Sequence, residues 1–176
     1  MTVAIRPHGI FGPKDQAVST MIAQAKKGMR FIIGDGQNIV DFTHVRNVVH
    51  GHIIAAEQLT PGSEACGQAF IITNDEPIGF WDFFGKVAEG MKCKKPSINL
   101  PYWLIYYISA LVQLIVLILK PLVHIKVTLI PSRVSLAATH HYYNCTKAKR
   151  ILSYTPIINL EDSIQQTLQY YSKANK

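Results

Sequence analysis

Charged residues are scarce in this sequence, and acidic residues are the scarcer kind. Only 16% of the 176 residues are charged and 48% are hydrophobic, while 18 lysines and arginines outnumber 11 acidic residues, which gives a formal net charge of +7. This excess indicates an anionic neighbour: phospholipid, nucleic acid or a phosphorylated cofactor. The chain is long enough to bury a core, so we expect one domain of ordinary size or a large piece of one.

Cysteine is also rare. The three cysteines form no C-x-x-C pair and are odd in number, so a disulfide framework is not expected and a reduced, cytosol-facing environment is the simpler interpretation. A signal peptide is not expected either, because Arg6, Pro7 and Gly9 interrupt the N-terminal region before an apolar core can form.

Strands and helices are predicted to alternate over the first 90 residues, which is the pattern of an α/β domain. The helix after Thr43 has the cleanest period. Thr43 is its expected N-cap, and its apolar face is predicted to comprise Val45, Val48, Val49, His52, Ile53 and Ala56. His50 lies off this face, so the pair His50-x-His52 cannot bind a metal from one side of the helix, and no metal site is predicted.

The stretch 6–15 follows the first predicted strand and holds two prolines and two glycines, which fix a sharp, extended turn. Open α/β sheets bind ligands at the carboxyl ends of their strands. The stretch is therefore a candidate ligand loop, with a plain strand-to-helix connection as the alternative.

Residues 102–119 form an uncharged apolar run that would be about 27 Å long as a helix, the lower limit for spanning a bilayer. Aromatic residues cluster at one end, as at a membrane interface, and lysines flank both ends, so that no orientation follows. An interfacial or partly dipping helix fits better than a full span. A buried core or subunit-contact helix is the alternative. Lipid headgroups are the expected anion and nucleic acid is not, because the lysines gather around this run.

Several motifs together resemble one known family. The sequence is similar to the C-terminal half of an extended short-chain dehydrogenase/reductase, in particular the 3-beta-hydroxysteroid dehydrogenase group and, within it, the members that decarboxylate a sterol at C4. The motifs, in chain order, are RPHGIFGP at 6–13, DFTHVRNVVHGH at 41–52, ITNDEP at 72–77, PYW at 101–103, HYYNC at 141–145 and YTP at 154–156.

The resemblance implies the C-terminal, substrate-side part of an extended Rossmann-type α/β fold with an apolar membrane-associated helix. Residues 1–101 would hold the end of the NAD(P)-binding domain and part of the substrate-side subdomain. Residues 102–123 would be the membrane-associated helix, and 124–176 a C-terminal substrate-side segment with a closing helix. The endoplasmic reticulum membrane, on its cytosolic face, is the implied location, with the lipid droplet as an alternative.

The resemblance also implies NAD(P)-dependent oxidation of a sterol 3-beta-hydroxyl, with loss of the C4 carboxylate in the most similar members. Pro7, His8 and Ile10 are carried over as contacts of the NAD or NADP cofactor, through backbone atoms. Phe11, Asp41 and Thr43 would lie on the side of the sterol or steroid substrate.

The sequence departs from the family in two places. No G-x-x-G-x-x-G or G-x-G-x-x-G motif follows a strand, and no Tyr-x-x-x-Lys pair stands upstream of the first strand. One literal match, Tyr143 to Lys147, lies in the family's C-terminal region and is interpreted as chance. No catalytic residue is therefore assigned. We expect the chain to be inactive without a missing or separate N-terminal half. A non-catalytic, membrane-bound sterol-binding or scaffold module is the alternative, and a homodimer remains open.

Overall fold

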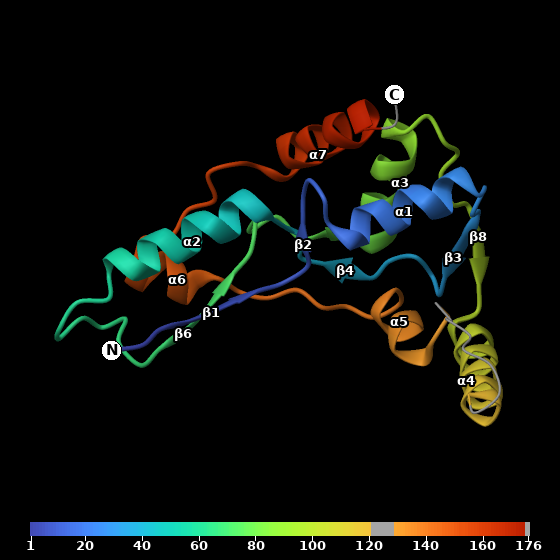
Figure 1. The fold of residues 1–176 in the computed structure, drawn as a ribbon, viewed down its shortest axis with the longest axis horizontal. Helices are drawn as coiled ribbons and strands as arrows, with labels where there is room; N and C mark the ends of the chain where they lie inside the picture. Colours follow the sequence, from blue (N-terminus) through green and yellow to red (C-terminus); the bar gives the residue numbers. More distant parts are fainter. Residues whose placement is uncertain (121–128, 175–176) are drawn as a thin grey trace.

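The computed structural model describes residues 1–120 and 129–174 and confirms the α/β prediction (Figure 1). The boundary predicted between 123 and 124 lies outside the described residues. The strands are β1 (Ala4–Pro7), β2 (Ile10–Phe11), β3 (Phe31–Ile33), β4 (Ile39–Val40), β5 (Thr43–His44), β6 (Ala69–Ile72), β7 (Ile78–Gly79) and β8 (Ile98–Leu100). The helices are α1 (Gln16–Lys26), α2 (Val45–Glu57), α3 (Phe80–Gly90), α4 (Tyr102–Leu119), α5 (Pro131–Leu136), α6 (Thr146–Leu152) and α7 (Leu160–Ala174).

Strand β1 pairs in parallel with β6, and its other edge has no neighbouring strand among the described residues. Successive residues of a parallel strand direct their backbone groups alternately to the two edges. The N–H of Ala4 donates to the carbonyl oxygen of Gln68 at 2.9 Å, so Val3 and Ile5 direct theirs to the open edge. The other pairs are β2 with β5 and β3 with β8, both parallel, and β4 with β7, antiparallel.

Helix α2 packs against the β1–β6 pair with the face formed by Asn47, Val48, Gly51 and Ala55 (Figure 1). A Cβ added at Gly51 would lie 3.2 Å from side-chain atoms of Ile72, so the helix approaches the strand closely. The predicted apolar face was wrong in the main: Val49 and Ile53 are 52% and 51% exposed. Small residues, not large ones, face the sheet because of this close approach.

The predicted N-cap of α2 was also wrong. Thr43 belongs to β5, and His44 is the N-cap, without a side-chain hydrogen bond to the helix. By contrast, α1 has a side-chain N-cap, because an Asp15 carboxylate oxygen accepts from the backbone N–H groups of Ala17 and Val18. A carboxylate is well placed there, beside free N–H groups at the positive end of the helix dipole.

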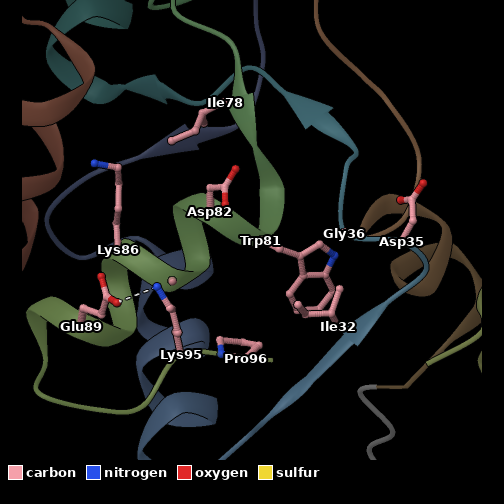
Figure 2. Close-up of a pocket in the computed structure, with 11 residues that line it drawn as sticks. Ile32, Asp35, Gly36, Ile78, Trp81, Asp82, Lys86, Glu89, Lys95 and Pro96 are labelled. Atoms are coloured by element: carbon pink, nitrogen blue, oxygen red, sulfur yellow. Dashed lines mark ion pairs between the residues drawn. The ribbon is translucent and has the colours of Figure 1, made fainter. Parts of the chain in front are cut away.

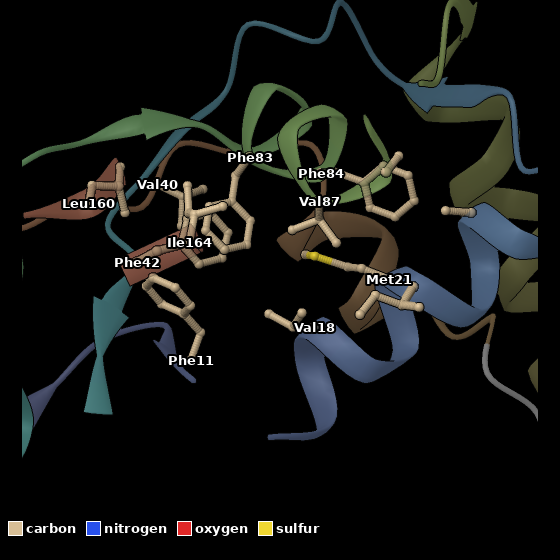
Figure 3. Packing of buried hydrophobic residues seen from close by; sticks show 13 residues of the cluster. Phe11, Val18, Met21, Val40, Phe42, Phe83, Phe84, Val87, Leu160 and Ile164 are labelled. Atoms are coloured by element: carbon tan, nitrogen blue, oxygen red, sulfur yellow. The ribbon is translucent and has the colours of Figure 1, made fainter. Parts of the chain in front are cut away.

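The larger hydrophobic core lies between α1, α3 and α7, where Val18 and Met21 of α1 face Phe83, Phe84 and Val87 of α3 (Figure 3). Phe42 stacks on Phe83 with ring centroids 3.8 Å apart, and Phe11 meets Phe83 edge to face at 5.1 Å. A second core joins β6, α2 and α6. The elements after α4 thus pack into the same body as those before it.

Helix α4 protrudes from this body (Figure 1). Only 6% of its 18 residues are buried, which excludes a core helix, and by length and composition it could cross a membrane. Its first turn is held to α5, since the Tyr102 hydroxyl oxygen lies 3.0 Å from the Ser135 hydroxyl oxygen. The chain after α4 therefore returns to the place where α4 begins.

Candidate functional site

The loop after β1 is bound to the segment that leads into β5. The imidazole Nδ1 of His8 donates to the Asp41 carbonyl oxygen at 2.9 Å, and the Thr43 hydroxyl donates to the His8 carbonyl oxygen at 2.5 Å. The Thr43 N–H donates to the Gly9 carbonyl oxygen at 3.0 Å. Gly9 has φ +52°, and an added Cβ would overlap the Asp41 carbonyl oxygen, so glycine is required.

The structure brings three of the predicted site residues, His8, Asp41 and Thr43, into direct contact. Pro7 lies beside His8, and Ile10 is exposed two residues further on. Phe11 does not face the pocket: its ring is buried among Phe42, His44 and Phe83 and packs the end of the loop against the core. The cofactor and substrate roles of these residues stay predictions.

A pocket of about 270 Å³ opens at the carboxyl end of β1, lined by Arg6, Pro7, His8, Ile71 and Tyr143. The ring centroid of His8 lies 4.8 Å from that of Tyr143 and 5.1 Å from that of His141. Sequence reasoning missed Tyr143 and His141 as site residues. The signal available was the motif at 141–145, which was used only for the resemblance.

Asp41 holds the two walls of this pocket together. Its carboxylate accepts from the backbone N–H of Tyr143 at 2.5 Å, while its other oxygen has no partner in the described part of the chain. Burial raises the pKa of Asp41, against the opposing effects of the Tyr143 N–H and of the charge on His8. Asp41 thus fixes His8 through its backbone and Tyr143 through its side chain.

The geometry agrees with the interpretation that the Tyr-x-x-x-Lys match at Tyr143 and Lys147 arises by chance and is not a catalytic pair. The Lys147 ammonium donates to the Gln68 side chain at 2.8 Å and to the Ala69 carbonyl at 3.1 Å, and it lies over the Phe70 ring. Tyr143 turns instead toward His8. Lys147 therefore anchors α6 to β6 and does not act on the Tyr143 hydroxyl.

A buried amide network fixes the C-terminal segment behind the site. The Asn47 amide donates to the Asn74 side-chain oxygen and to the Ile158 carbonyl, both at 2.8 Å. The Asn47 oxygen accepts from the N–H groups of Ile157 and Ile158 at 2.9 and 3.1 Å. The same Asn74 oxygen accepts the His44 N–H at 2.9 Å. Helix α2, the end of β6 and the entry to α7 are thereby joined.

A larger groove of about 660 Å³ lies elsewhere, along the exposed side of α3 (Figure 2). Lys95 is directed at Glu89 across it, with an ion-pair distance of 3.2 Å. Trp81 forms part of the wall and donates through Nε1 to the Ala137 carbonyl at 3.0 Å, which ties α3 to the end of α5. None of the predicted site residues line this groove.

The pocket at the carboxyl end of β1 stands where open α/β sheets bind ligands, but its volume lies just below the usual range of about 300–1,000 Å³ for ligand pockets. Pro7 and His8 line it, whereas Ile10 does not. Contacts to a dinucleotide cofactor stay a prediction. The pyrophosphate would need a glycine-rich turn at a helix N-terminus, which this sequence does not contain.

A parallel β–α–β unit with its pocket at a strand's carboxyl end defines a Rossmann-type α/β domain. Solved structures share this fold: the crystal structure of gox2253 superposes with a TM-score of 0.69 at 18% identity, over 98% of this chain and 49% of that one. The UDP-glucuronic acid 4-epimerase from Bacillus cereus in complex with NAD superposes with a TM-score of 0.64 at 17% identity, over 99% of this chain and 45% of that one.

A sequence model of the 3-beta hydroxysteroid dehydrogenase/isomerase family matches residues 1–102, and the chain belongs to this family. It is 48% identical to the decarboxylating sterol-4-alpha-carboxylate 3-dehydrogenase of Mus musculus, over 100% of this chain and 49% of that protein. It is 42% identical to 3beta-hydroxysteroid-dehydrogenase/decarboxylase isoform 1 of Arabidopsis thaliana, over 98% of this chain and 40% of that protein. The resemblance is confirmed, and the chain spans about half the length of the curated relatives it matches.

Proposed function

We propose that this chain forms the substrate side of an NAD(P)-dependent sterol dehydrogenase that oxidises the 3-beta-hydroxyl of a sterol 4-alpha-carboxylate. The observation that carries the proposal is the pocket at the carboxyl end of β1, between the loop 7–10 and Tyr143, in a chain of this family. The reaction is that named for the mouse relative.

The chemistry is coherent for such a substrate. Oxidation at C3 places a ketone next to the C4 carboxylate, which makes a beta-keto acid. The bond from C4 to the carboxylate carbon then breaks, carbon dioxide leaves, and the electron pair passes into an enolate on the C3 oxygen. The bound nicotinamide supplies the hydride acceptor. The loop at Pro7, His8 and Ile10 would hold its ring through backbone atoms, while Asp41 and Thr43 keep this loop in place beside the substrate.

The proposal includes a second structural segment, on the same or another chain, that carries the glycine-rich turn and the Tyr-x-x-x-Lys pair. Two surfaces support it. Strand β1 has an open edge at Val3 and Ile5. The apolar residues Val45, Val49 and Ile53 of α2 are exposed on the side of the helix away from the sheet. A further parallel strand of that segment would pair with the open edge of β1, and an apolar surface of the same segment would cover these residues of α2.

We expect the purified 176-residue chain alone to produce no NADH from a 4-alpha-carboxy sterol. We expect NADH when the chain is mixed with the N-terminal part of the mouse relative, the part that the chain does not cover. Ile5→Pro removes one N–H from the open edge of β1 and should abolish this complementation. Ile5→Val, which keeps this N–H and changes the same side chain, is the matched control. Turnover by the chain alone would contradict the proposal.

A second candidate is a non-catalytic, membrane-bound sterol-binding module. The exposed helix α4, in a chain without a nucleotide-binding motif, favours it. In that case the chain binds sterol, and no added segment yields NADH. The two candidates therefore differ in the complementation experiment.

We also propose that α4 attaches the chain to the cytosolic face of the endoplasmic reticulum membrane or to a lipid droplet. Its apolar side chains are exposed, and Trp103 and Tyr107 at its first turns suit the headgroup region. The Tyr102–Ser135 contact shows that the chain returns to the start of α4, and the elements before and after α4 form one body. The helix would therefore lie in or dip into one leaflet and would not cross the bilayer.

Vesicle flotation tests this attachment. Leu114→Lys places a charge on the exposed apolar side of α4 and should weaken binding to phosphatidylcholine vesicles by about ten- to a hundredfold, since burial of a leucine side chain contributes about 1.5–3 kcal/mol. Gln113→Lys, the matched control on the adjacent polar position, should change binding little. Equal losses in both variants, or protease protection of one terminus only, would indicate a helix that crosses the bilayer.

A further inference from the structure

Two hydrogen-bond donors and one ring nitrogen meet at the pocket beside β1 without a partner in residues 1–120 and 129–174. The donors are the Arg6 guanidinium and the Tyr143 hydroxyl, the ring nitrogen is His8 Nε2, and all three residues line the pocket. Each ion pair within these residues involves other cations: Lys86, Lys95, Lys149 and Arg150. No acidic residue lines the pocket. It is therefore a cationic pocket with unused donors.

The backbone and the Asp41 contacts hold these donors in place. Arg6 stands opposite Ile71 in the β1–β6 register, so both side chains project from the same face of the pair. The bond from His8 Nδ1–H to the Asp41 carbonyl fixes the imidazole tautomer and leaves Nε2 free. The Asp41 carboxylate holds the backbone of Tyr143, whose ring lies 4.8 Å from His8. Asp41 is thus a positioning residue for the His8 ring and for Tyr143.

We propose that this pocket binds the C4 carboxylate of the sterol acid, with the Arg6 guanidinium and the Tyr143 hydroxyl as its donors. This inference rests on the proposed function and names the part of the substrate that the chain recognises. A carboxylate offers two oxygens with about four acceptor sites, which suits a guanidinium fork and a hydroxyl. The volume of about 270 Å³ accommodates one end of a sterol and leaves the remaining rings outside.

The position of the pocket agrees with this assignment. Pro7 and His8, which carry the predicted nicotinamide contacts, form one wall, so that a carboxylate bound here would lie next to the carbon that is oxidised. A neutral carboxamide carries no charge to attract the Arg6 guanidinium, so an anion is favoured over nicotinamide itself as the occupant. A phosphate of the dinucleotide shares the anionic chemistry, and the experiment separates it from the carboxylate.

The test measures binding of two sterols to the 176-residue chain in detergent micelles: one with a 4-alpha-carboxylate and one with a 4-alpha-methyl group. We expect the carboxylate to bind at least tenfold more tightly. Arg6→Gln and Tyr143→Phe should each weaken binding of the carboxylate about tenfold and leave the methyl sterol unchanged. Both changes remove only atoms without a partner in the described residues, so folding is expected to persist. Tyr142→Phe, an exposed neighbour that does not line the pocket, is the matched control.

The outcomes separate this inference from the proposed function. Equal weakening of both sterols by Arg6→Gln and Tyr143→Phe, or no weakening of either, would overturn the assignment. If neither sterol binds the unmodified chain, the proposed function fails. Titration with acetate and inorganic phosphate, followed by NMR of labelled histidine and tyrosine rings, then decides the anion site. An Arg6-dependent response that favours acetate supports a carboxylate pocket. A response that favours phosphate, or none, overturns it.

Discussion

The buried amide of Asn47 offers the sharpest test of how the site is held together. Asn47→Ala removes the oxygen that accepts the N–H groups of Ile157 and Ile158 and the amide that donates to Asn74 and to the Ile158 carbonyl. The Asn74 amide still donates to the Ile158 carbonyl at 3.3 Å, so this acceptor keeps a partner. The loss therefore falls on two N–H groups.

The loss of unfolding free energy depends on how deeply the N–H groups of Ile157 and Ile158 are buried. An unsatisfied buried donor costs about 1–3 kcal/mol. Ile158 is buried and should incur close to the full cost, whereas Ile157 is exposed and water can replace its acceptor. Together with the small cavity, we expect the free energy of unfolding to fall by about 3 kcal/mol. For a chain of this length that corresponds to a decrease in Tm of about 6–12 °C.

Urea unfolding followed by circular dichroism, with detergent present throughout, measures this change. Gln166→Ala is the control, because Gln166 is exposed and meets Arg46 at 3.5 Å, too long for a strong bond. Its unfolding free energy should stay within about 0.5 kcal/mol of the unmodified chain. If Asn47→Ala is equally mild, the amide network does not hold the entry to α7, and its proposed role in stability is refuted.

Two further changes test the loop and the buried histidine. Gly9→Ala should lower the free energy of unfolding by at least about 3 kcal/mol, because the added Cβ would overlap the Asp41 carbonyl. Gly28→Ala is the control: Gly28 also has a positive φ, but it has open space around it, so the loss should be only about 1 kcal/mol. Equal effects of the two substitutions in thermal unfolding would exclude the overlap. Burial lowers the pKa of His44 in the folded chain from its ordinary value of 6.5. As the pH falls below 6.5, His44 of the unfolded chain therefore binds a proton before His44 of the folded chain does, and the free energy of unfolding should decrease. His44→Phe should reduce this fall between about pH 7 and pH 5, and an unchanged slope in urea titrations would show that His44 does not contribute.

Much of the fold could be predicted from sequence because large apolar residues at helical spacing mark a buried face. In α1, Val18, Met21, Ile22 and Ala25 stand at this spacing and are all buried. In α2 the same reasoning failed, because the helix comes so close to β6 that Gly51 and Ala55 must face it. The larger Val49 and Ile53 then point outward. Hydrophobic periodicity cannot detect a face that is selected for small size.

The candidate site was predictable only in part, for a similar reason. The loop 6–15 could be recognised by its prolines and glycines and by the family resemblance. Tyr143 could not be placed beside His8, because the contact joins positions 135 residues apart and depends on the Asp41 carboxylate between them. Thr43 was misassigned as the N-cap of α2 for want of the same information, since its hydroxyl donates to the His8 carbonyl and the helix begins one residue later.

The open edge of β1 also bears on the colloidal behaviour of the chain. Exposed edges of long, flat strands recruit copies of themselves, and fibril formation takes about six or seven residues of strand. Here β1 comprises only four residues and ends at Pro7, which has no N–H, after the exposed charge of Arg6. Pairing between two such edges would be short and reversible. We therefore expect concentrated solutions of the chain to form soluble, dilution-sensitive oligomers and not fibrils.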